Sequence, residues 1–204
     1  MKVIRYPLGQ LQANCYFLIE ADQCLIIDPA DDGSFILEEL QRRKLKLVGM
    51  LATHGHFDHI IAAGEIQQSI NIPLYIFKED MFLVSRMKET AEHWLGHEVI
   101  IFSPKNIKNL NIENSLKIKN FKFKIINTPG HTPGSCCLYL EKEKIVFTGD
   151  TLFKQGIGRY DFSYSNEKDL KQSINKILKL PEKTIIYPGH GEETTVKEEL
   201  SFHS

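Results

Sequence analysis

The chain has 204 residues, with 25 basic and 26 acidic side chains and a formal net charge of −1. This balance provides no field to attract nucleic acid or an anionic membrane surface. The length and the 42% content of hydrophobic residues fit one packed domain, residues 1–204. No apolar run approaches the roughly 18 residues of a membrane helix, and residues 1–8 lack the apolar core of a signal peptide. We therefore expect a soluble, cytoplasmic protein.

The first half alternates short strands and helices. Alternating or continuous apolar runs predict the strands, and a 3.6-residue period predicts the helices. The expected elements are strands at 3–6, 15–20 and 24–28, a helix at 33–44, a strand at 47–52, a helix at 60–69, a strand at 72–77 and a helix at 78–90. The last of these helices has an apolar stripe formed by Met81, Phe82, Val84 and Met87.

A cluster of three histidines and an aspartate follows the strand at 47–52, in the segment Thr53-His54-Gly55-His56-Phe57-Asp58-His59. Its first two histidines are two positions apart, so in an extended segment both side chains point to the same side. Neutral imidazole nitrogens and carboxylate oxygens are the usual ligands of zinc and similar metals. The segment therefore indicates a metal site, with a histidine-rich turn that binds no metal as the alternative.

The second half contains hairpins at 116–124 and 136–148, a helix at 166–178, a strand at 184–187 and a closing helix at 192–200. Asn120 lies where the alternation of the first hairpin changes phase, as expected of a turn residue. His203 lies in a terminal tail, where we expect disorder. The cysteines are too few for a disulfide framework in so long a chain, and we expect buried small side chains at Cys15, Cys24, Cys136 and Cys137.

Three strands of this half end in one local pattern, an apolar run followed by glycine or proline and then a ligand-type residue. Glycine lets the chain turn sharply at a strand end, so each turn would present its last side chain at a sheet rim. Together with the first cluster, the chain offers seven candidate ligands: His54, His56, Asp58, His59, His131, Asp150 and His190. Seven is the wrong number for one zinc but suits two metals that share a bridging carboxylate. We expect two helix-covered sheets with the site where their loops meet.

The order His-x-His-x-Asp-His and then a later His, Asp and His resembles the signature of the metallo-β-lactamase superfamily, and the resemblance covers nearly the whole chain. It implies an α/β (α+β) protein, a four-layer αββα sandwich with two mixed sheets flanked by helices. By the same resemblance, Asp28 supports the site without binding metal, although Ala30 replaces the more usual glycine of its loop. The implied ligands are His54, His56 and His131 for one ion, Asp58, His59 and His190 for the other, and Asp150 as the bridge.

Segments 14–16, 128–135, 148–153 and 187–191 are most similar to the glyoxalase II group, which hydrolyses S-D-lactoylglutathione to D-lactate and glutathione. The chain resembles the short, single-domain members, because it lacks the C-terminal domain that helps to bind glutathione. Arg159 and Tyr160 lie in the segment that replaces the glutathione-contacting one of the two-domain enzymes. They are the candidate substrate contacts, with an Arg159 paired to Asp161 as the structural alternative.

The resemblance implies two divalent metal ions as the cofactor, with zinc expected and iron or manganese as alternatives. Two ions about 3.5–4 Å apart share a water and lower its pKa toward about 7, giving hydroxide, and one of them polarises the substrate carbonyl. Asp58 is the expected catalytic residue, because it can orient the hydroxide or shuttle its proton. Thr132 and Ser135 are candidate hydrogen-bond donors behind the ligands, or simply turn residues. A thiol with a pKa of about 8.5 leaves readily, so we expect a small-molecule thioester substrate.

Other functions compete with this hypothesis. Persulfide dioxygenases resemble the chain in scaffold, ligand order and the segment 158–162, but they use one iron and more often have alanine in place of Gly189. The missing export signal disfavours a β-lactamase, and the absence of a basic surface disfavours nucleic-acid processing. Metal binding without hydrolysis is a further alternative. We expect His93 and His97 at the surface or the pocket rim, because Gly96 interrupts a regular helix between them, and we expect a monomer or a small homo-oligomer.

Overall fold

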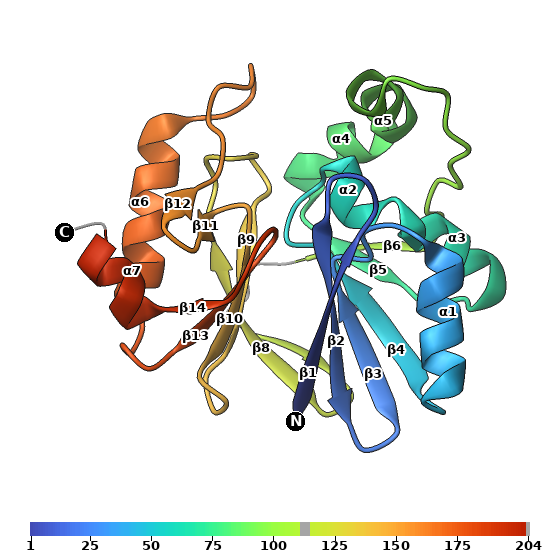
Figure 1. The fold of residues 1–204 in the computed structure, drawn as a ribbon, viewed down its shortest axis with the longest axis horizontal. Helices are drawn as coiled ribbons and strands as arrows, with labels where there is room; N and C mark the ends of the chain where they lie inside the picture. Colours follow the sequence, from blue (N-terminus) through green and yellow to red (C-terminus); the bar gives the residue numbers. More distant parts are fainter. Residues whose placement is uncertain (111–114, 203–204) are drawn as a thin grey trace.

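The computed structural model describes residues 1–110 and 115–202, so the expectation for His203 lies outside the described residues. Two six-stranded mixed sheets pack face to face, and helices cover both outer faces (Figure 1). This arrangement confirms the predicted αββα sandwich. Within the described ranges, no helix combines the length and the apolar character needed to cross a membrane.

The first sheet has the strand order β1-β2-β3-β4-β5-β6. The first three strands pair antiparallel, and β3 to β6 run parallel to one another. Two helices, α1 (Gly33–Arg42) and α3 (Ala62–Ser69), lie on its outer side (Figure 1). The strands are β1 (Lys2–Leu8), β2 (Ala13–Glu20), β3 (Gln23–Ile27), β4 (Lys46–Leu51), β5 (Leu74–Ile76) and β6 (Ile107–Asn109).

The second sheet has the order β14-β13-β10-β9-β8-β7, and within it only the β10–β13 pair runs parallel among the described strands. Helices α6 (Glu167–Leu178) and α7 (Val196–Phe202) lie on its outer side, and β11 (Leu152–Phe153) pairs with β12 (Gly156–Ile157) as a small ribbon. The strands are β7 (Leu116–Ile118), β8 (Phe121–Asn127), β9 (Cys136–Leu140), β10 (Ile145–Gly149), β13 (Ile185–Pro188) and β14 (Thr194–Thr195).

The core is divided into three apolar layers because neighbouring strand residues point to opposite faces. On β2, Tyr16 and Leu18 face the second sheet, while Phe17 faces the helices of the first sheet. Likewise Cys136 packs between the sheets and Cys137 packs under α6. All four cysteines are free and buried, as predicted. This packing leaves polar groups to gather at the strand ends.

Several predicted helices differ from the structure. The helix expected at 60–69 begins earlier, as α2 (Phe57–Ile60) followed by α3. The prediction of a single helix at 78–90 is wrong, because this segment contains three short helices. It is divided into a short 3-10 helix η1 (Lys78–Asp80), α4 (Met81–Ser85) and α5 (Met87–Leu95). Only half of its predicted apolar stripe is buried, because Met81 and Phe82 are exposed. Arg86 has non-helical backbone angles, which turns α5 relative to α4.

The closing helix begins later than predicted, at Val196 instead of residue 192. Thr194 and Thr195 pair with β13 as the edge strand β14, which the sequence did not reveal. The short strands β6, β11 and β12 were also missed, since two or three residues carry too little periodicity to be recognised. Both predicted hairpins are confirmed, as β7–β8 and β9–β10.

Candidate metal centre

The predicted ligands lie at the end of the sandwich where strands of both sheets finish. His54 and His56 follow β4, and Asp58 and His59 lie on α2. The remaining three ligands follow β8, β10 and β13 of the second sheet, and all three strands end at this place. The parallel pairing of β10 with β13 brings their carboxyl ends to one edge, which makes the two ligand-type residues beyond them neighbours: Asp150 and His190.

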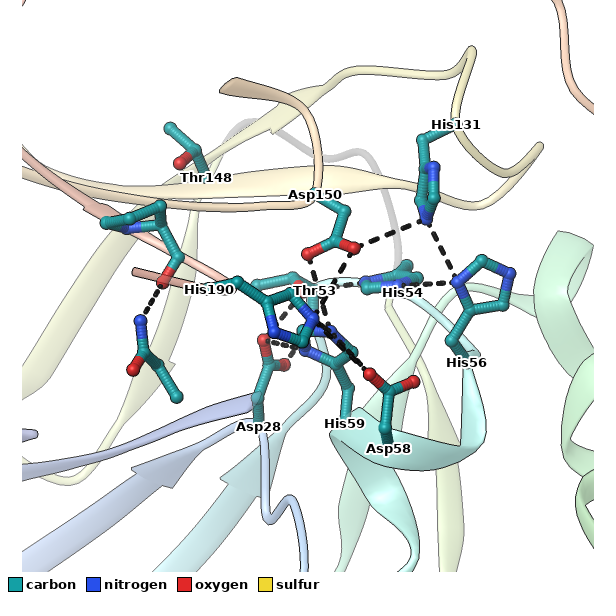
Figure 2. A network of polar contacts seen from close by, with 12 residues as sticks. Asp28, Thr53, His54, His56, Asp58, His59, His131, Thr148, Asp150 and His190 are labelled. Atoms are coloured by element: carbon teal, nitrogen blue, oxygen red, sulfur yellow. Dashed lines mark hydrogen bonds and ion pairs between the residues drawn. The ribbon is translucent and has the colours of Figure 1, made fainter. Parts of the chain in front are cut away.

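Three imidazoles converge on one position, on the right in Figure 2. Nε2 of His54 lies 3.1 Å from Nδ1 of His56, and Nε2 of His131 lies 2.9 Å from the same Nδ1. Two zinc–nitrogen bonds of about 2.0–2.1 Å at a tetrahedral angle place their nitrogens about 3.3 Å apart. These ring nitrogens therefore have a spacing close to that of ligands around one ion.

A second set of donors lies beside the first. Nε2 of His59 lies 3.2 Å from Nε2 of His190, and Oδ2 of Asp58 lies 3.3 Å from His190 Nε2 and 3.7 Å from His59 Nε2. Within each set, every pair of donor atoms lies within 4.8 Å. The chain therefore offers two separate groups of donors.

Asp150 lies between the two groups (Figure 2). Its Oδ1 is 3.4 Å from His59 Nε2, and its Oδ2 is 3.6 Å from His131 Nε2 and 3.8 Å from His190 Nε2. Oδ1 is buried and has no hydrogen-bond partner within the described part of the chain. A buried carboxylate oxygen without a hydrogen bond is costly, and a metal cation beside it reduces that cost. The donor set thus fits a pair of divalent ions that share this carboxylate.

The electrostatics of the cluster suit metal binding. Burial, together with neighbouring imidazoles, lowers the pKa of His54 well below its usual range and that of His56 to about 3, so both rings are neutral. Burial opposes a charge on His59, but Asp150 and Asp58 raise its pKa well above the usual value. Burial alone would raise the pKa of Asp150, yet His59 holds it well below its usual range. The ionised carboxylates therefore favour positive charge between the two groups.

Asp28 lies directly behind the second group of donors. Its Oδ2 accepts a hydrogen bond from His59 Nδ1 at 3.0 Å, and Thr53 donates to the two carboxylate oxygens from its backbone nitrogen at 2.7 Å and its hydroxyl at 2.8 Å. A carboxylate in this position fixes the orientation of the ring and raises its basicity as a ligand. The loop accommodates Ala30, which is fully buried, with Asp28 at a φ of 52°.

A second buried carboxylate, Asp80, connects the two loops that carry His56 and His131, and sequence reasoning missed it. It accepts hydrogen bonds from Gly55 N at 2.8 Å, Gly134 N at 2.6 Å and Thr132 Oγ1 at 2.7 Å. Its local sequence, Lys-Glu-Asp, is typical of an exposed helix start and carries no sign of this role. Only the folded chain brings the 3-10 helix η1 against both loops.

Thr132 donates a hydrogen bond to Asp80, and Ser135 pairs with Thr132. The two hydroxyl oxygens lie 2.7 Å apart, and Ser135 Oγ also accepts from the backbone nitrogen of Thr132 at 3.1 Å. Within the described residues, neither hydroxyl contacts a predicted ligand side chain directly. The prediction of donors directly behind the ligands therefore needs correction, since these residues support the His131 loop one step further away.

A cavity of about 340 Å³ opens above the ligands. Arg159 lines it and is also paired with Asp161, which is the structural alternative weighed from the sequence. Tyr160, the other candidate substrate contact, is 43% exposed and does not line this cavity. Tyr164, which the sequence did not single out, lines the cavity instead and places its hydroxyl 2.8 Å from His56 Nε2.

His93 and His97 lie away from the two donor groups. His93 is on α5, with its ring 5.8 Å from that of Trp94, and His97 follows the helix end at Gly96 and contacts Gln10 at 3.0 Å. Neither belongs to a metal-competent cluster among the described residues. Trp94, in contrast, lines the cavity and was not recognised from the sequence.

The fold and the donor set together define a metallo-hydrolase class, and comparison with known proteins gives the family. The sequence pattern of the metallo-beta-lactamase superfamily matches residues 8–190, and the chain belongs to this superfamily. It is 39% identical to the probable metallo-hydrolase YqgX of Bacillus subtilis, over 96% of this chain and 93% of that protein. It is 34% identical to the hydroxyacylglutathione hydrolase GloC of Haemophilus influenzae, over 98% and 95%.

Solved structures show the same fold. The BLEG-1 B3 metallo-beta-lactamase is 36% identical, with a TM-score of 0.91 over 98% of this chain and 97% of that one. TTHA1623 in a di-iron-bound form is 32% identical, with a TM-score of 0.88 over 97% of each chain. ETHE1 from Myxococcus xanthus is 25% identical, with a TM-score of 0.77 over 98% of this chain and 81% of that one.

Proposed function

We propose that residues 1–204 form a single catalytic domain that hydrolyses small thioesters with the help of two divalent metal ions. The observation that carries this proposal is the position of Asp150. Its carboxylate reaches the nitrogens of His59, His131 and His190, so one side chain joins two otherwise separate donor groups. A shared carboxylate between two ligand sets is the arrangement that a two-ion hydrolase requires.

The proposed ligands divide as the resemblance to the metallo-β-lactamase superfamily implies. His54, His56 and His131 would hold one ion, and Asp58, His59 and His190 the other. When bound, such a pair lowers the pKa of a shared water and polarises the carbonyl of the substrate. Zinc is the expected metal. Iron is the first alternative, because the similar TTHA1623 was solved in a di-iron-bound form.

The chain's own residues then position the reactants. Asp58 lines the cavity, and one of its oxygens faces His190, so its carboxylate can accept a hydrogen bond from the attacking water and orient it. Tyr164 and Phe162 form the facing wall and keep water away from the reacting carbonyl. The leaving thiol needs little assistance from an acid, because a free thiol has a pKa of about 8.5. This is why a thioester suits the site better than an amide.

S-D-lactoylglutathione is the first substrate to test. The glyoxalase II-like segments and the 34% identity to a protein named hydroxyacylglutathione hydrolase both support it. The test is a hydrolysis assay over a panel of thioesters, with elemental analysis of the same protein sample. We expect two ions per chain and hydrolysis that stops when a chelator removes them and resumes when zinc, iron or manganese is returned. A protein with two ions that hydrolyses none of the thioesters would contradict the proposal.

A persulfide dioxygenase with one iron is the second candidate. The segment 158–162 favours it, because Arg159 and Phe162 from this segment line the cavity. Gly189 favours the two-ion hydrolase. A Cβ added there would overlap Asp150 Oδ1 and lie 2.7 Å from His59 Cε1, so an alanine would displace the shared carboxylate. One iron per chain with oxygen uptake on glutathione persulfide would establish the dioxygenase instead.

Metal binding without turnover is separated from both enzymes by the variant Asp58→Ala. If the chain is a hydrolase, this variant loses hydrolysis while His54, His56 and His131 still bind an ion. If neither wild type nor variant shows activity and both bind metal or a partner equally, the domain serves as a binding module.

A further inference from the structure

The wall of the cavity that faces the ligands is apolar. It is built from both halves of the chain and consists of Leu11, Trp94, Phe153, Ile157, Phe162 and Tyr164. The ring of Phe162 lies 5.4 Å from that of His56 and 5.8 Å from that of His131. A second ring, Tyr164, stacks on Phe162 with centroids 5.4 Å apart. Any acyl group held at the ligands must therefore pack against aromatic surface.

Away from the proposed metal ions, the cavity offers little positive charge for an anionic thiol carrier. Arg159 is the only lysine or arginine among the described lining residues. Asp161 accepts from its Nε at 2.9 Å and from its Nη2 at 2.8 Å, which neutralises the charge with two parallel hydrogen bonds. The guanidinium carbon also lies 4.6 Å from the centre of the Phe162 ring and 5.3 Å from that of Trp94. Two rings and one carboxylate thus hold this group in place.

Glutathione carries two carboxylates and one ammonium, so its thioesters have a net negative charge. Placing that charge against the apolar wall, away from the proposed ions and without a free side-chain cation, is unfavourable. The volume of about 340 Å³ also lies at the lower end of the range of about 300–1,000 Å³ for ligand cavities. A small apolar group fits such a cavity better than a charged tripeptide does.

We propose that the cavity selects thioesters with an apolar or aromatic acyl group on an uncharged thiol carrier, and that the Arg159–Asp161 pair disfavours anionic carriers. This inference rests on the proposed thioester hydrolysis and narrows its substrate class. It predicts that S-D-lactoylglutathione is a poor substrate: its thioester bond can be hydrolysed, but its thiol carrier is anionic. Asp161 acts here as a positioning residue, because it reaches the substrate only through Arg159.

Trp94 provides a direct measurement of binding, because it is the single tryptophan of the chain and lines the cavity. Its fluorescence can follow two thioethers that cannot be hydrolysed, S-benzyl-N-acetylcysteamine and S-benzylglutathione, on the metal-loaded protein. We expect the neutral probe to bind about tenfold more tightly, which corresponds to about 1.4 kcal/mol. Equal or tighter binding of S-benzylglutathione would overturn the inference.

Two matched variants test the ion pair. Asp161→Asn frees Arg159, and we expect the kcat/KM for phenylacetyl-glutathione, relative to phenylacetyl-N-acetylcysteamine, to rise about fivefold at low salt. Added salt should reduce this gain, since it screens exposed charges. Asp22→Asn is the control: it removes another exposed pair, Lys46–Asp22 at 2.9 Å, at the far end of β2 and β3. An identical ratio in the two variants would refute the proposed role of Asp161.

The acyl preference is tested with the same carrier throughout. Across acetyl, butanoyl and phenylacetyl thioesters of N-acetylcysteamine, kcat/KM should rise by about fourfold for each buried methylene. Trp94→Ala should reduce this rise. If no thioester is hydrolysed, the proposed function fails and this inference fails with it. Hydrolysis with equal or better use of the glutathione thioesters overturns the inference alone.

Discussion

The floor of the cavity and its mouth are built differently. The floor consists of the seven candidate ligands with Asp28 and Asp80 behind them, and these two carboxylates are almost fully buried and accept backbone and side-chain hydrogen bonds. The mouth contains Trp94, which is 46% exposed, and an exposed ion pair, Arg159–Asp161. Buried hydrogen bonds to charged groups hold geometry firmly, whereas exposed pairs contribute little.

This difference assigns separate tasks to the two regions. A rigid floor suits chemistry that depends on the spacing of the metal ligands. The aromatic and charged side chains at the mouth can be substituted without changing that spacing. We therefore expect changes in the floor to alter metal content and rate by orders of magnitude. Changes at the mouth should alter the choice of substrate by smaller factors. Four of the predictions below test this division, from the largest effect to the smallest, and a fifth concerns a site outside both regions.

The largest effect is expected for Asp150→Asn. The amide of asparagine is uncharged and cannot bridge two cations as a carboxylate can. We therefore expect loss of the two-ion centre and a decrease in hydrolysis of at least about a thousandfold. Elemental analysis and the thioester assay measure the two effects, with Asp22→Asn as the charge-matched control. Two ions per chain and near-normal hydrolysis in Asp150→Asn would show that this carboxylate is not the bridge.

Gly189→Ala tests the floor without removing any donor. The added methyl would overlap Asp150 and press on His59, so we expect metal content to fall from about two ions to about one and hydrolysis to fall about a hundredfold. Gly156→Ala is the matched control, because a Cβ there meets no atom closer than 3.9 Å. Unchanged metal content in Gly189→Ala would remove our main structural reason for preferring the two-ion hydrolase.

Asp80→Asn tests a part of the floor that touches no ion. The amide can accept from fewer of Gly55, Gly134 and Thr132, so the two ligand loops should loosen. We expect metal affinity to fall about 10- to 100-fold and the free energy of unfolding to fall by about 1–3 kcal/mol. Competition with a chromogenic chelator and urea unfolding measure these quantities. Normal metal affinity in a destabilised variant would limit Asp80 to a structural role.

Tyr164→Phe probes the boundary between floor and mouth. It removes the hydroxyl that lies 2.8 Å from His56 Nε2 but keeps the ring that stacks on Phe162. We expect metal affinity to fall only about three- to tenfold, which corresponds to the net free energy of one hydrogen bond. Chelator competition checks this. A hundredfold loss would place Tyr164 in the floor, with the same importance as Asp80.

The smallest effect is expected outside both regions, at Glu39 on α1. Its hydrogen bonds with Arg42, Tyr6 and Arg43 lower the pKa of its carboxyl to about 2. The pKa is depressed in the folded state, so the ionised carboxylate stabilises the fold above the ordinary value of about 4.3. That stability is lost as the pH falls toward about 2.

Glu39→Gln should therefore lower the free energy of unfolding at pH 6 by about 1 kcal/mol. The unfolding curves of variant and wild type should converge as the pH falls from about 4.3 toward about 2. Urea unfolding over this range measures the difference, and hydrolysis at pH 7 should stay the same in both. A constant difference at all these pH values would contradict the assigned cause of the pKa shift.

Most of the fold was predictable from local signals. Alternation along β7 and β8 identifies their buried faces, because the side-chain period of a strand is a property of the backbone. The division of residues 78–95 into three short helices was not predictable, since helical spacing of apolar residues persists through it. The reason is tertiary: Asp80 is held by two distant loops, and exposed Met81 and Phe82 follow it at the rim of the site.

The sequence by itself determined the set of seven donors, because ligand chemistry and the turn residues at a strand end are both written within a few positions. The tertiary structure alone decided how those donors stand relative to one another and what surrounds them. Asp80 contacts Gly134 across 54 positions, and Arg159 meets Trp94 across a similar stretch of chain. Such contacts arise only when two sheets pack face to face, because no local pattern of residues encodes a meeting of segments so far apart.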